Sequence, residues 1–297
     1  MPDQILTASP PRSRDRRPRV PTPRPLCVGV DVGGTWIRVA ASSGERPVPP
    51  TVARADRDLR RLAPLLRAIW RRRGWRRDRV AALVVASRAI WSERERRALA
   101  RRLAGLARRV AVISDAQAAL LGALGNRPGL LVLAGTGSIV LGYDGRRHWA
   151  RAGGLGPLLG DEGSAFWLGR EWLRSRAAHG GLRTVLGAVH APDAVARVAA
   201  WAPRVLARAR HGDGAARAIA YAGQAVLAAQ ARAVARQLGL RRPVAISWAG
   251  SVLDDAWFRA GLARAVRRAG LTVCWYRPAA EPVTAATRLA ERMRKQV

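Results

Sequence analysis

Lysine is almost absent from this chain, although the chain is strongly basic. Of its 53 lysine and arginine residues only Lys295 is a lysine, and the formal net charge is +33. The sequence therefore contains no G-x-x-x-x-G-K-[ST] phosphate loop and no lysine in a strand of the protein-kinase type. Lysine Schiff-base chemistry is disfavoured for the same reason. Any phosphoryl transfer must work through backbone amides, hydroxyl groups, arginines and a metal ion.

Cysteine, histidine and long apolar runs are also scarce. The chain has two cysteines and four histidines, and they show no zinc-ligand spacing. Cys27 and Cys274 each lie in a strand-like apolar run, which predicts two buried free thiols in a reducing cytoplasm. No run of about 18 apolar residues occurs, so no membrane span and no membrane partner are expected.

Asparagine, phenylalanine and tyrosine are rare, and the codon usage behind their scarcity also explains the high arginine content. Asn126 is the single asparagine, and there are two phenylalanines and three tyrosines. Codons for these residues are rich in A and T, whereas arginine, alanine and glycine are abundant, so a G+C-rich genome accounts for the composition. The arginines also spread along most of the chain. We therefore expect no specific nucleic-acid partner, although the positive field could attract anionic substrates.

The first 25 residues differ from the rest of the chain. Residues 1–25 are rich in proline and arginine and lack apolar periodicity, which predicts a disordered tail. They contain no apolar segment of the secretory-signal type. The chain as a whole is 49% hydrophobic and 297 residues long, which predicts a globular protein of two domains.

Apolar strands alternate with amphipathic helices, which predicts α/β domains with mixed sheets. Strands are expected at residues 26–32, 36–42, 80–87, 109–114, 129–134, 138–143, 243–249 and 271–276. Helices are expected at about residues 58–73, 93–107, 116–125, 164–178, 193–210, 213–238 and 281–295.

Two hairpins about 100 residues apart share one design, which suggests a duplicated architecture. In the first, Asp31 ends an apolar strand and Gly33, Gly34 and Thr35 form the turn; in the second, the turn is the run Gly135-Thr136-Gly137-Ser138. Glycines let backbone amides approach a phosphate, and the hydroxyl groups add donors. Two facing hairpins could clamp a triphosphate, with Asp31 holding Mg²⁺ through water. A plain tight turn is the alternative for each hairpin alone.

Asp115 lies between the hairpins in sequence, at the end of a strand and the start of a helix. A helix cap would explain it without any function. In a phosphoryl-transfer site it would be the base that takes the proton from the attacking hydroxyl group.

The stretch Gly153–Gly169 holds six glycines and the acid pair Asp161 and Glu162, and it is nearly free of basic residues. It is either a tight turn that caps the following helix or a loop whose backbone approaches a ligand closely.

The motifs DVGGT, ISDAQAALLGAL, LAGTGSIVLGYDG, GGLGPLLGDEGSAFWLGREWL and WAGSVL, in this order, resemble the BadF/BadG/BcrA/BcrD-type ATPase family, which includes N-acetylglucosamine kinases. The resemblance covers about residues 26–292. It implies the actin-like ATPase fold: two ribonuclease-H-like α/β domains with ATP in the cleft between them. The implied domains are residues 26–114 with 283–297, and residues 115–282.

The resemblance also implies roles for individual residues. Asp31 and the first turn would serve one phosphate motif and Gly135 to Ser138 the other, with Asp115 as the catalytic base. The sugar would contact Gly154, Leu155, Gly156 and Asp161. Gly223, Gly250 and Ser251 would hold the adenosine end of the nucleotide. Leu155 stands where related sugar kinases carry an aromatic residue, and the two cysteines lack the spacing for the iron–sulfur cluster of other family members.

The expected function is ATP- and Mg²⁺-dependent phosphorylation of a sugar hydroxyl in the cytoplasm, with an amino sugar or N-acetylated sugar as the expected acceptor. Two alternatives remain: an ATPase or nucleotide or sugar sensor without sugar kinase activity, and a polyanion-binding protein that works through its basic tail. A homodimer is left open.

Overall fold

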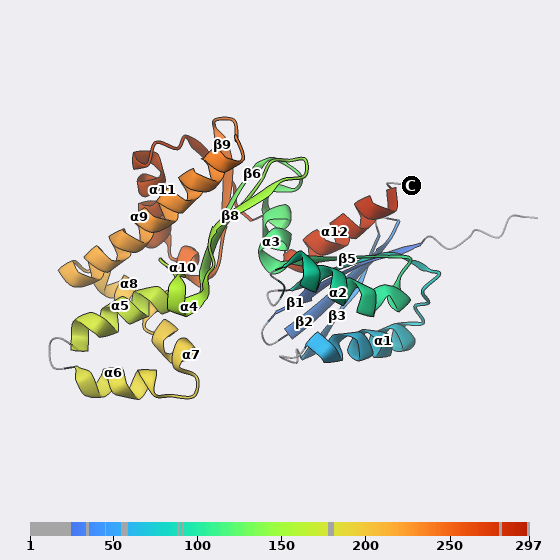
Figure 1. Cartoon of the computed structure of the whole chain (residues 1–297), viewed down its shortest axis with the longest axis horizontal. Helices are drawn as coiled ribbons and strands as arrows, with labels where there is room; N and C mark the ends of the chain where they lie inside the picture. The colour runs from blue at the N-terminus through green and yellow to red at the C-terminus, as the bar shows by residue number, and fades with distance from the viewer. Residues whose placement is uncertain are drawn as a thin grey trace, which may run out of the picture.

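The computed structural model shows two lobes, each built on a five-stranded sheet (Figure 1). The described parts of the chain are residues 25–33, 36–44, 46–54, 59–87, 90, 92–177, 181–278 and 281–295. The predicted disordered tail therefore lies outside the described residues, apart from Pro25.

The first sheet has the strand order β3-β2-β1-β4-β5. β1 is antiparallel to β2 and parallel to β4, and β5 is parallel to β4. The strands are β1 (Leu26–Val32), β2 (Trp36–Ser43), β3 (Arg46–Arg54), β4 (Val80–Ser87) and β5 (Arg109–Ser114).

The second sheet repeats this topology with the order β8-β7-β6-β9-β10. β6 is antiparallel to β7 and parallel to β9, as β1 is to β2 and β4. The strands are β6 (Gly129–Ala134), β7 (Ser138–Tyr143), β8 (Trp149–Gly153), β9 (Val244–Ala249) and β10 (Val273–Trp275). The duplicated architecture and the α/β class predicted from the two hairpins are confirmed.

Helices cover both faces of each sheet. Their bounds are α1 (Leu62–Arg73), α2 (Glu93–Leu103), α3 (Asp115–Leu124), α4 (Gly156–Leu159), α5 (Ala165–Ala177), α6 (Leu182–Val189), α7 (Ala194–Ala199), α8 (Ala202–Arg210), α9 (Gly214–Gln237), α10 (Ser251–Asp254), α11 (Ala256–Arg268) and α12 (Pro282–Lys295). Short 3₁₀ turns precede α1 at Leu59–Arg61 and follow α2 at Ala104–Leu106.

The first sheet is covered by α1 and α2 on one face and by α12 on the other. Leu66 and Leu103, from α1 and α2, are fully buried with Val28 and Val30 of β1. On the opposite face, α12 approaches β1 so closely that a Cβ on Gly29 would lie 2.3 Å from the backbone nitrogen of Thr287. Helix α12 thus packs beside the first strand of the described chain, as Figure 1 shows.

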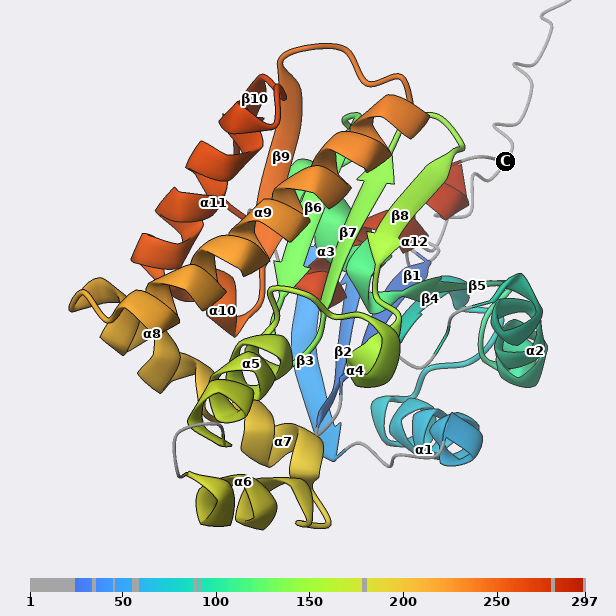
Figure 2. The same cartoon turned by 60° about the vertical axis from the view of Figure 1, so that its left-hand side comes forward.

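The second sheet is covered by α9 and α11 on one face and by α3 on the other. Leu227 and Phe258, from α9 and α11, share a core with Val132 of β6, and Figure 2 shows α9 crossing this sheet. Leu120 of α3 packs against Leu131 on the opposite face. Because α3 covers the second sheet and α12 the first, the packing supports a domain division at 114/115 and 282/283, which stays a proposal.

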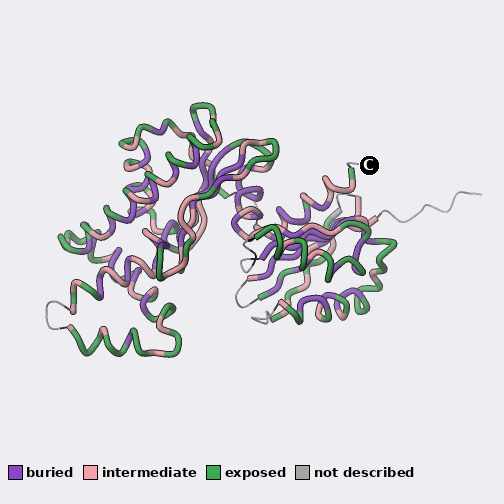
Figure 3. Tube along the Cα trace, viewed as in Figure 1, coloured by how far each residue is buried: buried purple, intermediate pink, exposed green. Residues whose placement is uncertain are grey.

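Several elements differ from the sequence prediction. β3, β8, α6 and α11 were not expected, and the single helix predicted at 193–210 is two helices, α7 and α8, with Trp201 between them and Pro203 in the first turn of α8. β3 contains three prolines, which an edge strand tolerates because one side needs no ladder hydrogen bonds. α6 lies at the outer end of its lobe and is largely exposed (Figure 3).

The prediction of two buried thiols is half wrong. Cys27 is buried under α12, whereas Cys274 is exposed, because β10 is the edge strand of its sheet and turns this side chain outward. Among the described helices, none is long and apolar enough to cross a membrane.

Candidate active site

A cavity of about 700 Å³ lies where the two lobes meet. It brings together seven of the residues predicted from the sequence: Asp115, Thr136, Gly137, Ser138, Gly154, Gly156 and Asp161. Its remaining walls come from both lobes, with Ile90 and Arg96 from the first and Leu141 and Trp149 from the second. The cavity therefore joins the second hairpin, the Asp161 loop and the predicted base in one place.

Asp115 reaches this cavity because the parallel strands β1, β4 and β5 have their carboxyl ends at the same edge of the first sheet. Val32 of β1 is in register with Ser87 of β4, and Ser87 with Ser114 of β5, so their carboxyl ends share one edge of the sheet. Asp115 is the next residue after β5 and the first of α3. Ligand sites of open α/β sheets form at such edges.

The helix-cap explanation for Asp115 is wrong, because Ser114 is the cap. The Ser114 hydroxyl accepts from the Gln117 amide at 3.1 Å, and the Gln117 side chain accepts from the Ser114 amide at 2.9 Å. Asp115 is only half-buried, and its Oδ1 accepts from the Ala116 amide at 2.7 Å. The cap is complete without Asp115, so the capping role gives no reason for an acid at this position.

Asp31 is a buried acid at the carboxyl end of β1, 7% exposed. Its Oδ2 lies 3.5 Å from Nη1 of Arg38, its register partner on β2. Burial raises the pKa of Asp31; Arg38 acts against this rise, and the charge of Asp115 adds to it. Asp31 is not among the residues that line the cavity.

A magnesium ion fits this region only with help from other ligands. The described residues contain no cluster of three His, Cys, Asp or Glu that could hold a metal alone. Mg²⁺ usually keeps several waters and binds through one or two carboxylates plus substrate phosphates. Asp31, a buried carboxylate at the carboxyl end of β1, would be one such carboxylate.

The first hairpin can be assessed only in part, because Gly34 and Thr35 lie outside the described residues. The Gly33 amide donates to the Trp36 carbonyl oxygen at 3.0 Å, and in the second hairpin the Gly135 amide donates to the Gly137 carbonyl at 2.9 Å. The first glycine of each hairpin thus closes its own turn. Within the described part of the chain, the amides of Thr136 and Gly137 donate to no backbone carbonyl, and both residues line the cavity.

Ser138 ties the second hairpin to the acid loop. Its hydroxyl donates to the Glu162 carbonyl at 2.8 Å, and its amide donates to the Asp161 carboxylate. The carbonyl oxygens of Gly135 and Thr136 accept from the amides of Ala165 and Phe166 at 2.8 and 3.2 Å, at the start of α5. The hairpin and α5 therefore form one rigid unit.

Asp161 lies against the second hairpin in a conformation unusual for a side chain other than glycine. Its φ is +61°, it is 7% exposed, and a Cβ on Gly137 would lie 2.6 Å from its Oδ2. Burial raises the pKa of Asp161, although hydrogen bonds from the amides of Ser138 and Gly156 act in the opposite direction. Backbone strain of this kind is found at functional sites that the surrounding structure holds in place.

The glycines of the acid loop have the backbone requirement that the sequence suggested. Gly154 and Gly156 have φ of +68° and +79°, and both line the cavity. Leu155, predicted beside the sugar, is 61% exposed and does not line the cavity. An aromatic residue from another element, Trp149 of β8, lines the cavity and stacks on Tyr143 with 4.4 Å between the ring centroids.

The predicted adenosine residues fall into two groups. Gly250 follows β9 and lies against the second hairpin: its φ is +97°, and a Cβ there would be 2.4 Å from the Ala134 carbonyl oxygen. Ser251 is next in the chain and begins α10. Gly223 is buried in α9, where a Cβ would lie 2.9 Å from Cα of Gly163, so helix-to-loop packing explains this glycine.

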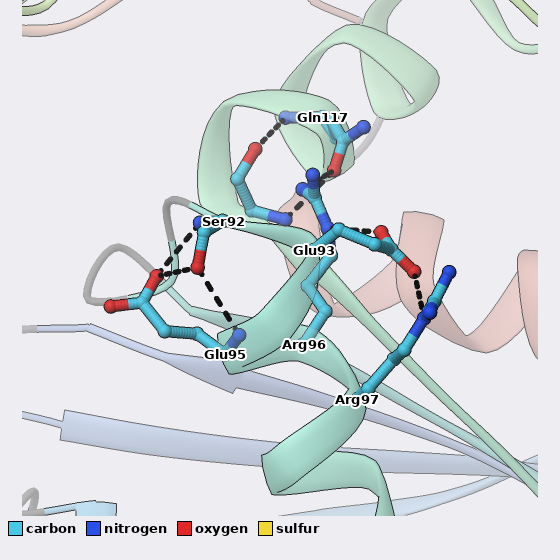
Figure 4. Close-up of polar contacts among 7 residues, drawn as sticks. Ser92, Glu93, Glu95, Arg96, Arg97 and Gln117 are labelled. Atoms are coloured by element: carbon cyan, nitrogen blue, oxygen red, sulfur yellow. Dashed lines mark hydrogen bonds and ion pairs between the residues drawn. The ribbon is translucent and has the colours of Figure 1, made fainter.

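The cavity residues that sequence reasoning missed include Arg96, Gln117, Trp149 and Arg151. Gln117 had a readable signal, the Ser-x-x-Gln spacing of a capping box. Arg96 had none, because arginine is common throughout the chain. Figure 4 shows how Arg96 of α2 reaches Gln117 of α3, with 3.4 Å between Nη1 and Oε1.

Comparisons with known proteins bear on the family and the fold of the chain. The model of the BadF/BadG/BcrA/BcrD ATPase family matches residues 28–283. An N-acetylmuramic acid/N-acetylglucosamine kinase of Clostridium acetobutylicum is 43% identical over 61 residues, which are 20% of this chain and 20% of that protein. The chain thus matches only about a fifth of this curated relative's length.

Solved structures are similar over most of the chain. A protein assigned as an N-acetylglucosamine kinase from Chromobacterium violaceum has a TM-score of 0.65 and 25% identity, covering 90% of this chain and 99% of that one. A ROK hexokinase from Thermus thermophilus has a TM-score of 0.59 and 19% identity, with coverage of 89% and 98%. The second likeness concerns the fold alone.

Proposed function

Because the chain belongs to the BadF/BadG/BcrA/BcrD ATPase family, we propose that it transfers the γ-phosphoryl group of ATP to a hydroxyl group of an amino sugar or N-acetylated sugar. The single observation that carries the proposal is that Asp115, Gly137 and Asp161 line one cavity between the lobes. The names of the similar proteins, kinases of N-acetylglucosamine and of N-acetylmuramic acid, support the sugar as acceptor.

Each part of the site has a distinct task in this proposal. The amides of Thr136 and Gly137 bind the phosphates of ATP, and Gly250 and Ser251 hold its adenosine end, whereas Gly223 allows α9 to approach the acid loop closely. Asp161 accepts hydrogen bonds from acceptor hydroxyl groups, and the backbone of Gly154 and Gly156 shapes the space around the sugar. Asp31 would hold Mg²⁺ through water, and that ion would neutralise charge on the phosphates.

The reaction itself needs a proton acceptor. The acceptor oxygen forms a bond to the γ-phosphorus while the bond from that phosphorus to the bridging oxygen of ADP breaks. The hydroxyl proton passes to the Asp115 carboxylate. Asp115 suits this role because it is half-buried, lies on the cavity wall and is not needed for the helix cap. A cytoplasmic location belongs to the proposal because ATP is supplied there.

The test is ADP release measured against a panel of sugars, with and without Mg²⁺. We expect release above the acceptor-free rate with at least one amino sugar or N-acetylated sugar, and a phosphorylated product of matching mass. Asp115→Asn should abolish most of this release, whereas Asp78→Asn, an exposed acid paired with Arg76, should not. An acceptor-free rate that no sugar increases would leave an ATPase or sensor and refute the kinase.

A further inference from the structure

The cavity between the lobes is longer than the region that the proposed reaction uses. Its floor follows β7 and β8 from Ile139, which lies opposite Gly153, to Trp149 at the start of β8. Figure 2 shows β8 leading from this far end toward α4, which belongs to the acid loop. At a rise of about 3.3 Å per strand residue, Trp149 is roughly 13 Å from Gly153. A single sugar ring held at the acid loop would therefore leave the Trp149 end of the cavity empty.

Trp149 presents a fixed aromatic side chain to this far end. Its indole ring stacks on Tyr143, with 4.4 Å between the centroids and 24° between the planes. The Tyr143 hydroxyl in turn donates to the Arg146 carbonyl oxygen at 2.9 Å, which holds the tyrosine ring in place. Trp149 is only half-buried and lines the cavity, so part of its ring is available to a ligand.

The floor next to Trp149 is apolar. Ile139 and Leu141 of β7 line the cavity, whereas Val140 between them points to the opposite face and packs in the core with α9. Arg151 lies opposite Leu141 in the ladder and is engaged in another interaction. An apolar strip therefore runs along β7 and ends at the indole ring of Trp149.

A second wall of the cavity comes from α2 and α3 and is polar. Oε1 of Gln117 accepts from the Ser114 amide at 2.9 Å and from Nη1 of Arg96 at 3.4 Å, and Figure 4 shows the contact with Arg96. These two donors fix the orientation of the carboxamide, so its NH₂ group is the end left for other contacts. Among the described residues, neither Nε2 of Gln117 nor Nη2 of Arg96 has a hydrogen-bond partner. Both groups are donors available to a ligand.

A cavity with one apolar and one polar wall suits a sugar ring. The C–H face of a pyranose packs on an aromatic ring, and the hydroxyl groups at its edge accept hydrogen bonds. A purely apolar substituent would instead bury the donors of Gln117 and Arg96 without partners, which is unfavourable. The volume of about 700 Å³ is in the range for drug-sized ligands and exceeds the volume of one sugar ring.

From these observations we infer that the acceptor is a disaccharide, whose first ring lies at the acid loop and whose second ring stacks on Trp149. This inference rests on the proposed function and extends its substrate class from one sugar ring to two. Hydroxyl groups of the second ring accept hydrogen bonds from Gln117 and Arg96. Trp149 contacts the substrate away from the reacting atoms, so it determines affinity for the second ring and not for the first.

Calorimetric titration of the nucleotide-free protein tests this without requiring catalysis. The probes are N-acetylglucosamine and its β-1,4-linked disaccharide, N,N′-diacetylchitobiose. The parent should bind the disaccharide about 10-fold more tightly, the gain expected from one aromatic contact and one hydrogen bond. Trp149→Ala should reduce this preference to less than about threefold and leave the affinity for the monosaccharide unchanged. Trp149→Phe keeps an aromatic face and should retain part of the preference.

Trp257→Ala is the matched control, because Trp257 also stacks on a tyrosine of the second lobe, Tyr221 at 6.0 Å between centroids, but does not line the cavity. It should keep the preference for the disaccharide. An equal loss of affinity for both sugars in Trp149→Ala would mean that Trp149 only supports the shape of the site, and it would overturn the inference. Equal affinity of the parent for the two sugars, or binding of neither, would also overturn it.

The phenyl β-glycoside of N-acetylglucosamine distinguishes a second sugar ring from an apolar group. The parent should bind it less tightly than the disaccharide, because a phenyl group cannot accept hydrogen bonds from Gln117 and Arg96 as hydroxyl groups do. Equal or tighter binding of the phenyl glycoside would assign the Trp149 end to an apolar group and overturn the inference. Phosphorylation of N-acetylglucosamine by the parent, measured separately, shows whether the kinase proposal survives such a failure.

Discussion

The two lobes have the same strand order, yet their glycine hairpins carry different side chains at matching positions. In the first, the register pair two steps from the turn is Asp31 with Arg38; in the second, it is Leu133 with Ile139. The first hairpin thus holds an acid of its own. The second instead has the Asp161 carboxylate placed against Gly137 by a separate loop. The repeated scaffold thus provides two similar turns, each with an acid beside it that comes from a different part of the chain.

The largest effect is expected at the junction of the lobes, with Asp115→Asn. General-base catalysis contributes about 10²–10⁴-fold, so kcat should fall by that factor. Binding of ATP and sugar should change little, because the lost interaction operates mainly in the transition state. The Tm should stay near that of the parent, because Ser114 provides the cap.

Steady-state kinetics with thermal denaturation on the same samples checks this prediction. Near-full turnover in Asp115→Asn would show that Asp115 is not the general base.

The next effect concerns the second hairpin, where Gly137→Val adds a side chain against Asp161. The new Cβ would lie 2.6 Å from Oδ2, so the carboxylate must move and lose its hydrogen bonds from Ser138 and Gly156. We expect ATP affinity to fall about 10–100-fold, the range for loss of charged hydrogen bonds. Titration with a non-hydrolysable ATP analogue measures the change.

Gly187→Val is a suitable control for this variant, because a Cβ at Gly187 meets nothing within 4 Å. The two hairpins should also differ in their sensitivity to substitution. In Gly33→Ala the new Cβ would lie 3.2 Å from the Trp36 carbonyl oxygen, so ATP affinity should fall less than in Gly137→Val. Unchanged nucleotide affinity in Gly137→Val would contradict the role of the second hairpin.

The smallest effect on turnover, with a gain in stability, is expected for Asp31→Asn. Loss of a carboxylate that holds Mg²⁺ through water should reduce turnover about 10–100-fold. Burial raises the pKa of Asp31 above its unfolded value, so the folded state favours the protonated form and the ionised form weakens folding at neutral pH. The variant should therefore have the higher Tm at pH 7.

The stability gain of Asp31→Asn should depend on pH. As the pH falls toward the raised pKa, the parent carboxyl becomes protonated and its disadvantage disappears, so the two Tm values should converge in acid. Calorimetric scans between pH 7 and pH 4 would show this. If the Tm of the variant instead rose further above that of the parent in acid, the Arg38 ion pair would have a larger effect on the pKa of Asp31 than burial has.

Sequence reasoning was reliable where local geometry demands particular residues. The two hairpins, the strand before Asp115 and the glycines at positive φ in the acid loop were all readable, because turns and buried strands constrain composition locally. The edge strand β3 was missed because three prolines in nine residues resemble a loop. Arg96 was missed for a different reason: α2 brings it to the cavity through tertiary packing, which no local pattern encodes.

The close fit of α12 on β1 has a consequence for the order in which the protein can be completed during translation. The face of the first sheet that includes Cys27, Ala82 and Val84 is covered by Ala286 and Ala290 of α12. A ribosome releases these strands long before it makes that helix, and domains tend to fold in the order of synthesis. The first lobe must therefore wait, with an apolar face uncovered, until the entire second lobe has been made.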